Sequence, residues 1–248
     1  SAVRPVAESF QDSLPPSFPS PPPLAARRPA GSPRFAPHQV MAPRLPSKQK
    51  ESPRKTLVHV IRHGEAQHNV DHKFLAKRDT CLTARGLCQA RALRRLLTEL
   101  RPELLVTSPI LRALQTTKAS DFQGKVVVVP DARERVACAS HLSDLPIDPA
   151  GSSAAAFGDL GWDWSFFAPG DDAEIEVEAH ARIEARASSL TAFLEERPES
   201  NIALVSHGGF LMRLTRDTYM GNCEVRSYEV SEGQWRKVSR AEVSCSRL

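Results

Sequence analysis

The sequence predicts an α/β fold, a three-layer sandwich in which a mainly parallel sheet carries helices on both faces. From residue 57 onward, short runs of apolar and β-branched residues alternate with longer runs of helical periodicity. Two of the strand-like runs end in His-Gly, at His63 and at His207. Open α/β sheets bind their ligands where strands deliver such residues into loops. We therefore expect one catalytic domain with its site at this edge of the sheet.

The first expected strand, residues 57–61, lies in the stretch LVHVIRHGEAQHN, around which the rest of the chain is organised. This buried-strand run ends abruptly in a cation, an imidazole and a glycine, which are Arg62, His63 and Gly64. A neutral imidazole is a competent nucleophile, because its unperturbed pKa is about 6.5. The pattern predicts that His63 is a nucleophile for phosphoryl groups and is held beside Arg62.

The following elements continue the alternation. Residues 65 to about 73 are expected to form a short helix. Thr83 is the expected N-cap of a helix with leucines at helical spacing, which Pro102 ends. Pro109 is expected at the first position of the next helix. The remaining predicted elements are strands at 104–108 and 125–129, a helix at 173–197, strands at 202–206 and 225–230, and a strand at 234–238 that pairs with its predecessor across the turn 231–233.

Residues 131–171 show no clear periodicity, although they contain several aromatic side chains. Long irregular stretches inside compact domains often form lids or binding loops. A surface insertion pinned by its aromatic residues explains the same pattern, and both interpretations stay open.

The first 55 residues contain 13 of the 20 prolines, nine Lys/Arg and three Asp/Glu. Such a segment cannot bury enough apolar surface to offset its ordering entropy. We therefore expect a disordered Pro/Arg-rich segment at 1–55 and the folded catalytic domain at 56–248. For residues 1–40, an organelle transit peptide, a docking ligand and translated upstream sequence are alternative interpretations.

Charge and cysteine content exclude several classes of protein. Residues 56–248 carry 24 basic and 26 acidic side chains, so the basic character belongs to the N-terminal segment, and no nucleic-acid partner is expected. Five cysteines without a CxxC pair favour free thiols in a reducing compartment. No apolar run approaches the length of a membrane-spanning helix. We expect a cytoplasmic protein with no membrane partner; organelle targeting is the alternative, and the sequence leaves the oligomeric state open.

The surroundings of the two histidines match the needs of phosphate chemistry. A phosphomonoester brings about two negative charges, which need guanidinium groups and oriented N–H donors. Arg62 is adjacent to the first histidine, and Arg112 lies near the start of the helix that follows the second strand. The helices after Gly64 and Gly208 are expected to point backbone N–H groups at the anion.

In the mechanism that these groups support, His63 attacks phosphorus and forms a phosphohistidine. The two arginines and a protonated His207 stabilise the equatorial oxygens. The leaving alcohol needs a proton from a carboxylic acid opposite the nucleophile. Glu134 is the first candidate for this acid. The other candidates are Asp131 and then Asp159 and Asp163. The scheme requires no metal and no cofactor.

The segments RHGEAQHN, LTARGLCQA, SPILRALQT and SHGGF resemble the four signatures of the histidine phosphatase superfamily, the phosphoglycerate mutase-like proteins. The resemblance covers about residues 56–230, in the order and spacing of the family. LEERPESNIALVSHGGFL and NCEVRSYEV resemble the plant and fungal phosphatases of this family. The implied fold is the phosphoglycerate mutase-like α/β sandwich.

The resemblance also implies roles for individual residues. It makes His63 the phosphorylated residue, Glu134 the proton donor, and Arg62, Arg112 and His207 the phosphate pocket. Asn69 and Thr83 occupy positions near the phosphate or its ester group. Asn222, Glu224 and Arg226 match a C-terminal element for which we expect structural ion pairing.

One departure from the family's mutases bears on the reaction. Those enzymes resemble one another in a Glu-Arg-His-Tyr-Gly segment, whereas Glu134-Arg135 here continues as Val-Ala-Cys-Ala-Ser. Net hydrolysis of a small-molecule phosphomonoester or a phosphoprotein is therefore the leading hypothesis. The alternatives are a phosphoglycerate mutase and a catalytically weak phospho-ligand binding protein.

Overall fold

A computed structural model describes residues 54–147, 156–166 and 177–239 of the chain. These ranges contain a six-stranded sheet in the order β3-β2-β4-β1-β5-β6. Nearly all of the expected disordered segment 1–55 lies outside the described residues, as do parts of the irregular stretch 131–171. The strands are β1 (Thr56–Arg62), β2 (Leu104–Thr107), β3 (Lys125–Val128), β4 (Asn201–Ser206), β5 (Val225–Ser231) and β6 (Gln234–Val238).

The sheet is mixed but mainly parallel, as predicted. β1, β2, β3 and β4 pair with one another in parallel, while β5 runs antiparallel to β1, and β6 antiparallel to β5. β6 therefore joins β5 as a hairpin across the expected turn. The α-helices with described bounds are α1 (Gln67–Val70), α2 (Ala84–Leu100), α3 (Leu111–Ala119), α5 (His180–Glu196) and α6 (Gly208–Thr215).

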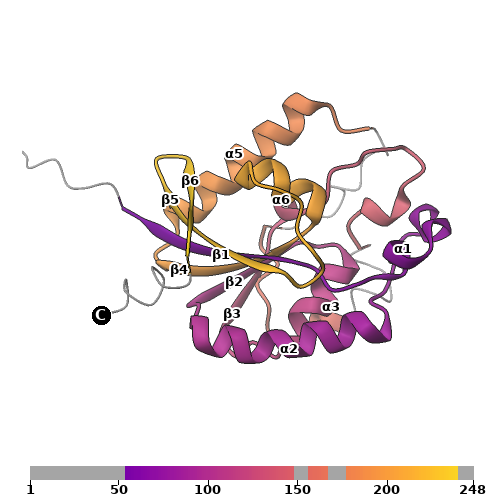
Figure 1. Ribbon diagram of the computed structural model, residues 1–248, viewed down its shortest axis with the longest axis horizontal. Coiled ribbons are helices and arrows are strands. Elements are labelled where there is room, and N and C mark those ends of the chain that lie inside the picture. The colour runs from indigo at the N-terminus through magenta and orange to yellow at the C-terminus, as the bar shows by residue number, and fades with distance from the viewer. Residues whose placement is uncertain (1–53, 148–155, 167–176, 240–248) are drawn as a thin grey trace, which may run out of the picture. The chain divides into compact units, whose positions relative to one another are not determined.

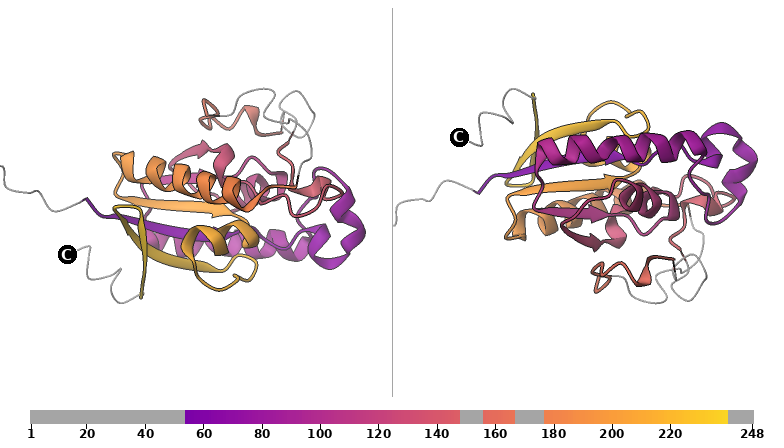
Figure 2. Two further views of the ribbon diagram at one scale, coloured as in Figure 1. Left: turned by 90° about the horizontal axis from the view of Figure 1, so that it is seen from above. Right: turned by 90° about the horizontal axis from the view of Figure 1, so that it is seen from below.

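Helices cover both faces of the sheet. Figure 1 shows α2 and α3 on one side and α5 and α6 on the other, and Figure 2 shows the same layers from two further directions. Alternate residues of β4 follow this division. Ile202 and Leu204 pack with α5 and α6, whereas Ala203 and Val205 pack with α2 and α3. Because both faces are buried, the strand is apolar along its length, which explains why its pattern does not alternate.

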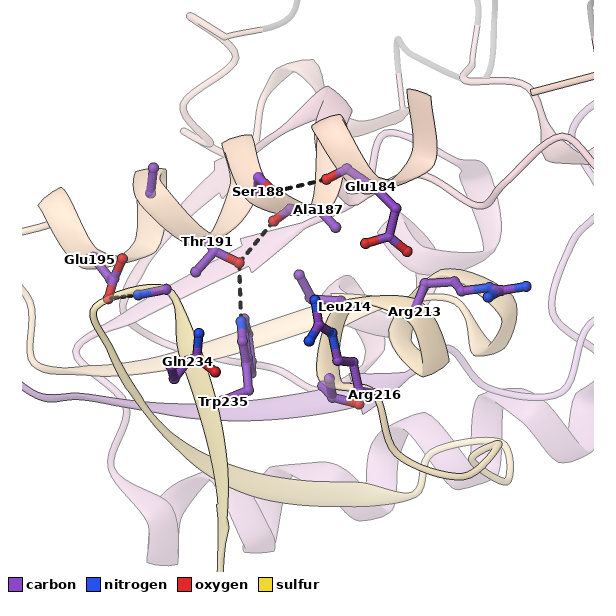
Figure 3. Close-up of a pocket in the computed structure, with 13 residues that line it drawn as sticks. Glu184, Ala187, Ser188, Thr191, Glu195, Arg213, Leu214, Arg216, Gln234 and Trp235 are labelled. Carbon is purple, nitrogen blue, oxygen red and sulfur yellow. Dashed lines mark hydrogen bonds between the residues drawn. The ribbon is translucent and has the colours of Figure 1, made fainter. Parts of the chain in front are cut away.

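The β5–β6 hairpin is fastened to α5 by side chains that Figure 3 shows. The indole N–H of Trp235 donates to Thr191 Oγ1 (3.0 Å), and the N–H of Gly233 donates to Glu195 Oε1 (3.0 Å). A cavity of about 260 Å³ lies between α5, α6 and this hairpin. Within the ranges described, no helix combines the length and the apolar character needed to cross a bilayer.

Three predicted helix boundaries were wrong. The expected helix 65–73 is interrupted at Asp71, whose extended backbone ends α1 and whose side chain accepts from the N–H of Lys73 (3.1 Å) to start a 3-10 helix, His72–Ala76. Pro109 lies two residues before α3, because Ile110 is the N-cap. α5 begins at His180, because the N-cap Ala179 has a non-helical backbone (φ −59°, ψ 146°), and residues 173–176 lie outside the described range.

The two interpretations of residues 131–171 each fit a different part. Trp162 and Trp164 pack against the core beside β3, and Asp163 exchanges backbone hydrogen bonds with Val126 and Val128 (2.9 Å each). Residues 156–166 are therefore an insertion pinned to the edge of the sheet. Residues 134–144 of the same stretch instead reach the edge of the sheet at which the parallel strands end, where several of them line a cavity.

The loop after β1 touches the first turn of α2 through backbone atoms. A Cβ on Gly64 would lie 2.7 Å from the carbonyl oxygen of Gly86, and a Cβ on Gly86 would lie 2.0 Å from that of Glu65. Real Cβ atoms do not approach backbone oxygens this closely, so both positions require glycine.

Replacing Gly86 with alanine therefore tests this contact. Helix propensity alone predicts stabilisation by up to about 1 kcal/mol. We expect instead a loss of about 1–3 kcal/mol in the free energy of unfolding, because the loop must move away from α2. Denaturant unfolding measures the change, with exposed Arg91→Ala on the same helix as the control, expected within about 0.5 kcal/mol of the parent. A stabilised Gly86→Ala protein would contradict the contact.

Candidate active site

The register of β1 and β4 brings the two histidines together. Arg62 pairs with Ser206 in this parallel ladder, so His63 and His207 leave the sheet side by side. Their ring centroids lie 5.1 Å apart, and both side chains are buried. The two imidazoles thus meet at one edge of the sheet, as the sequence predicted.

The hydrogen bonds of His63 define its tautomer. Nδ1 lies 2.7 Å from the carbonyl oxygen of Gly64, which can only accept, so Nδ1 carries the proton. Nε2 accepts from Arg112 Nε at 3.2 Å. Burial first, and then the charges of Arg112 and Arg62, hold the pKa of His63 well below its usual value. The side chain is therefore neutral, with a lone pair on Nε2.

Arg112 is almost fully buried at the centre of the site. Besides His63, its guanidinium donates to the carbonyl oxygen of Ser143 and to Asp144 Oδ1 (3.2 Å). Burial lowers its pKa, and the charge of Asp144 opposes this shift. Asp144 therefore offsets part of the cost of placing a buried cation beside His63.

Arg62 is held from the other side. Its Nη1 donates to the carbonyl oxygen of Met220 (2.8 Å), and its Cζ lies 4.8 Å from the ring centroid of Tyr219. Its Nε is buried and has no hydrogen-bond partner among the described residues. This N–H is thus a donor that the described part of the protein does not satisfy.

Glu134 lies in the loop that follows β3, close to the start of α6. Its Oε1 accepts from the N–H of Arg135 (2.9 Å), and its Oε2 accepts from the N–H of Gly209 (3.1 Å). Burial, and next the charge of Asp144, raise the pKa of Glu134. A Cβ at Gly209 would lie 2.8 Å from Oε1, so glycine there permits the close approach.

A cavity of about 290 Å³ opens at these groups. Five of the sequence-predicted site residues line it, namely Arg62, His63, Asn69, Arg112 and Glu134. His207 packs against the ring of His63 from behind. Gly64, Thr83 and Gly208 do not line the cavity.

Those three residues have other contacts. Thr83 caps α2, as predicted: its hydroxyl accepts from the N–H of Gly86 (3.0 Å) and donates to Glu65 Oε1 (2.8 Å). A Cβ at Gly208 would lie 2.6 Å from the ring of Tyr219. The site role expected for Thr83 therefore has no geometric support, because its hydroxyl is occupied at the helix start.

Four of the expected backbone N–H donors are also engaged. The N–H of Gly64 donates to Thr116 Oγ1 (2.9 Å), that of Glu65 to Gln89 Oε1 (2.9 Å), and that of Ala66 to Asn69 Oδ1 (3.0 Å). The N–H of Gly209 donates to Glu134. Side-chain amides, a hydroxyl and a carboxylate have thus taken these four N–H groups, which were expected to be offered to an anion.

His207 was expected to be protonated, but the groups that surround it favour the neutral imidazole. Burial, followed by the charges of Arg112 and His63, keeps its pKa well below the usual value. Its Nε2 lies 2.7 Å from Ser108 Oγ, and its buried Nδ1 has no partner in the part of the chain that the structure describes. Protonation would need a nearby negative charge.

Sequence reasoning missed several residues that line the cavity: His68, His72, Leu75, Arg135, Ala137, Asp144, Gly209 and Tyr219. His68 lies within the RHGEAQHN motif, and its pKa is lowered to about 3 by burial and then by the charge of Arg112. Asp144 had no local signal, because it belongs to a stretch without periodicity. Asp131, Asp159 and Asp163, the other acid candidates, do not line the cavity.

The C-terminal element has the structural role that was expected. Arg226 Nε donates to Glu224 Oε1 (2.6 Å). Asn222 Nδ2 donates to the carbonyl oxygen of His63 (3.0 Å) and to Asn69 Oδ1 (3.3 Å), which fixes the backbone at His63. Within the described ranges, no three His, Cys, Asp or Glu side chains are grouped as metal ligands.

Known phosphatases resemble this chain in sequence over most of its length. The glucosyl-3-phosphoglycerate phosphatase of Mycobacterium tuberculosis is 29% identical over 168 residues, which are 63% of this chain and 72% of the relative. The adenosylcobalamin/alpha-ribazole phosphatase of Escherichia coli is 30% identical over 184 residues, which are 71% and 86%.

A solved structure supports the fold. The crystal structure of the alpha-ribazole phosphatase from Shigella flexneri superposes with a TM-score of 0.54 at 24% identity and covers 74% of this chain and 95% of that one. The sequence model of the histidine phosphatase superfamily (branch 1) matches residues 58–243. Since this match spans the sheet, its helices and the paired imidazoles, the chain belongs to the histidine phosphatase superfamily.

Proposed function

We propose that this chain hydrolyses phosphomonoesters through a phosphohistidine formed on His63. The observation that carries the proposal is the tautomer of its neutral imidazole. Nδ1–H is fixed on the carbonyl oxygen of Gly64, so the lone pair lies on Nε2, 3.2 Å from the buried guanidinium of Arg112. A nucleophile of this kind, next to cations that attract a phosphate dianion, is suited to phosphoryl transfer.

In the first step, Nε2 of His63 bonds to phosphorus and the bond from phosphorus to the ester oxygen breaks. Arg62 and Arg112 stabilise the equatorial oxygens, and each such donor typically contributes about 10²–10³ in rate. Glu134 gives its proton to the departing alkoxide. The negative charge of the bound phosphate would also raise the pKa of His207 and so favour a proton on its Nδ1.

In the second step, the Glu134 carboxylate takes a proton from water as the water oxygen attacks phosphorus. The bond from phosphorus to Nε2 breaks, and its electron pair returns to the imidazole. Inorganic phosphate leaves, and both Glu134 and His63 regain their starting protonation states. One carboxyl group near the nucleophile thus acts as acid and then as base.

The substrate we propose is a small-molecule phosphate ester. The relatives above are named for such esters, and the cavity of about 290 Å³ suits a compact ligand. The expected likeness to plant and fungal phosphatases rests on the C-terminal segments, whereas these relatives are bacterial. A phosphoprotein substrate has no supporting feature in the described residues.

Trapping the intermediate tests the proposal. We expect wild-type protein quenched during turnover of a ³²P-labelled phosphoester to carry acid-labile label on His63. His63→Asn should lose the label and lower kcat/KM by about three orders of magnitude or more, because it removes the imidazole nitrogen that bonds to phosphorus in the proposed first step.

The exposed His180→Asn on α5 is the matched control and should retain both label and turnover. Label that persists in His63→Asn would overturn the assignment. Transfer of the label between the two monophosphoglycerates faster than phosphate release would favour the mutase alternative instead.

The pH profile tests the two protonation states. Attack needs neutral His63, whose lowered pKa keeps it neutral until the pH falls well below 6.5. It also needs protonated Glu134. The pKa of Glu134 is raised above 4.5, and the carboxyl group loses its proton as the pH rises through this raised pKa. We expect kcat/KM, corrected for ionisation of the substrate, to be highest on the acidic side of neutrality.

Glu134→Gln separates these two limbs. It should lower kcat/KM for an alkyl phosphate by about 10²–10⁴ and remove the basic limb while leaving the acidic one. A basic limb that survives unchanged in Glu134→Gln would assign it to another group.

A further inference from the structure

Arg186 on α5 does not line the catalytic cavity, yet its guanidinium reaches the loop that carries Glu134. The side chain is 6% exposed. Nη1 donates to the carbonyl oxygens of Asp131 (2.8 Å) and Arg133 (2.7 Å), and Nη2 lies 3.5 Å from that of Glu134. One guanidinium therefore binds three backbone carbonyls in four consecutive residues.

Glu178 fixes this guanidinium in place. Arg186 Nε donates to Oε1 (2.9 Å) and Nη2 donates to Oε2 (2.7 Å), and both side chains are buried. The planar fork of an arginine matches a carboxylate in this bidentate form, which a lysine cannot reproduce. The N–H of Glu178 also donates to the carbonyl oxygen of Val136 (2.9 Å), so the ion pair is joined to both ends of the Glu134 loop.

The same guanidinium contacts the helix that holds the carboxyl group of Glu134. Its Cζ lies 4.3 Å from the ring centroid of Phe210, which is fully buried on α6. Gly209, the residue before Phe210, donates its N–H to Glu134 Oε2. The backbone and the side chain of Glu134 are therefore both located relative to Arg186.

The loop has an attachment that does not involve Arg186. Ser206 Oγ donates to the carbonyl oxygen of Ala132 (2.7 Å), and Ala132 packs in the main core. Without Arg186, the loop would stay on the sheet at Ala132, while the segment from Arg133 to Glu134 would lose its fixed geometry. Arg186 is thus not needed to attach the loop to the sheet, but it fixes the position of Glu134 within the loop.

We propose that Arg186, held by Glu178, is a positioning residue for the general acid Glu134. This inference rests on the proposed function. An acid must lie about 2.6–3.2 Å from the atom that it protonates, and a displacement of about 1 Å can cost about 100-fold in rate. Neither member of the ion pair lines the catalytic cavity, so its effect reaches the reaction through Glu134.

Two esters with different leaving groups separate positioning from folding. The leaving group of p-nitrophenyl phosphate departs without needing a proton, whereas that of glycerol 3-phosphate requires one. We expect Arg186→Met to lower kcat/KM for glycerol 3-phosphate by about 100-fold and for p-nitrophenyl phosphate by no more than about 3-fold. Under the proposed function, kcat/KM reports the phosphorylation step, in which the acid acts.

Leu190→Ala on the same helix is the control for lost stability, because its fully buried side chain makes no hydrogen bond to the loop. It should change kcat/KM for both esters by the same small factor. Should Arg186→Met fail to fold, Arg186→Lys replaces it. Its ammonium can pair with Glu178 but cannot span the carbonyls, and about a 10-fold selective loss on glycerol 3-phosphate is expected.

The decisive test combines Arg186→Met with Glu134→Gln. With the acid removed, adding Arg186→Met should lower kcat/KM for glycerol 3-phosphate by no more than about 3-fold further. Equal losses on both esters, or a full further loss in the Glu134→Gln background, would overturn the positioning role. Failure of the proposed function itself would look different: wild-type protein would leave His63 unlabelled with either ester.

Discussion

The burial of two guanidinium groups beside two imidazoles is the constraint on which the site depends. Removing a cation from water is costly unless partners replace its hydration. Arg112 obtains them from Ser143 and Asp144, and Arg62 from Met220 and the face of Tyr219. Because these partners leave a net positive field, protonation of the neighbouring histidines is disfavoured. Burial and, after it, the charges of Arg112 and Arg62 thus hold the pKa of His63 low and keep its imidazole neutral.

The parallel sheet is what brings these groups together from distant parts of the chain. Neighbouring parallel strands end at one edge, so His63 and His207 become adjacent although most of the chain separates them. The backbone around His63 is then fixed by Ser206, Asn222 and Cys223 through hydrogen bonds to its N–H and carbonyl groups. A nucleophile held in this way loses little freedom on reaching its reactive geometry.

Local patterns were sufficient to predict the strands and the two histidines. Apolar β-branched runs have few alternatives to buried strands, and each histidine follows such a run directly. The N-cap at Thr83 was also predictable, because its hydroxyl acts on residues three positions away. What these signals share is that their cause lies within a few residues.

The features that the sequence did not reveal have distant causes. Whether the N–H groups after Gly64 were free for an anion depended on Thr116 and Gln89, which belong to other helices. Asp144 gains its role only because a loop without periodicity folds back onto Arg112. These hydrogen-bond partners are set by tertiary packing, and a short window of sequence does not contain the residues that supply them.

The two halves of the site are consequently built in different ways. On the phosphate side, Arg62 ends β1, and His63 and His207 directly follow β1 and β4, so the ladder of the sheet sets their geometry. Arg112 joins them from the first turn of α3. The leaving-group side, with Glu134, Arg135, Ala137 and Asp144, comes from an irregular loop that has no ladder of its own. Such a loop needs other fixings, and buried charge supplies them: Arg186 binds its carbonyls, and Arg112 binds Asp144. Substrate preference can therefore change through this loop while the chemistry at phosphorus is preserved, provided that the acid stays anchored.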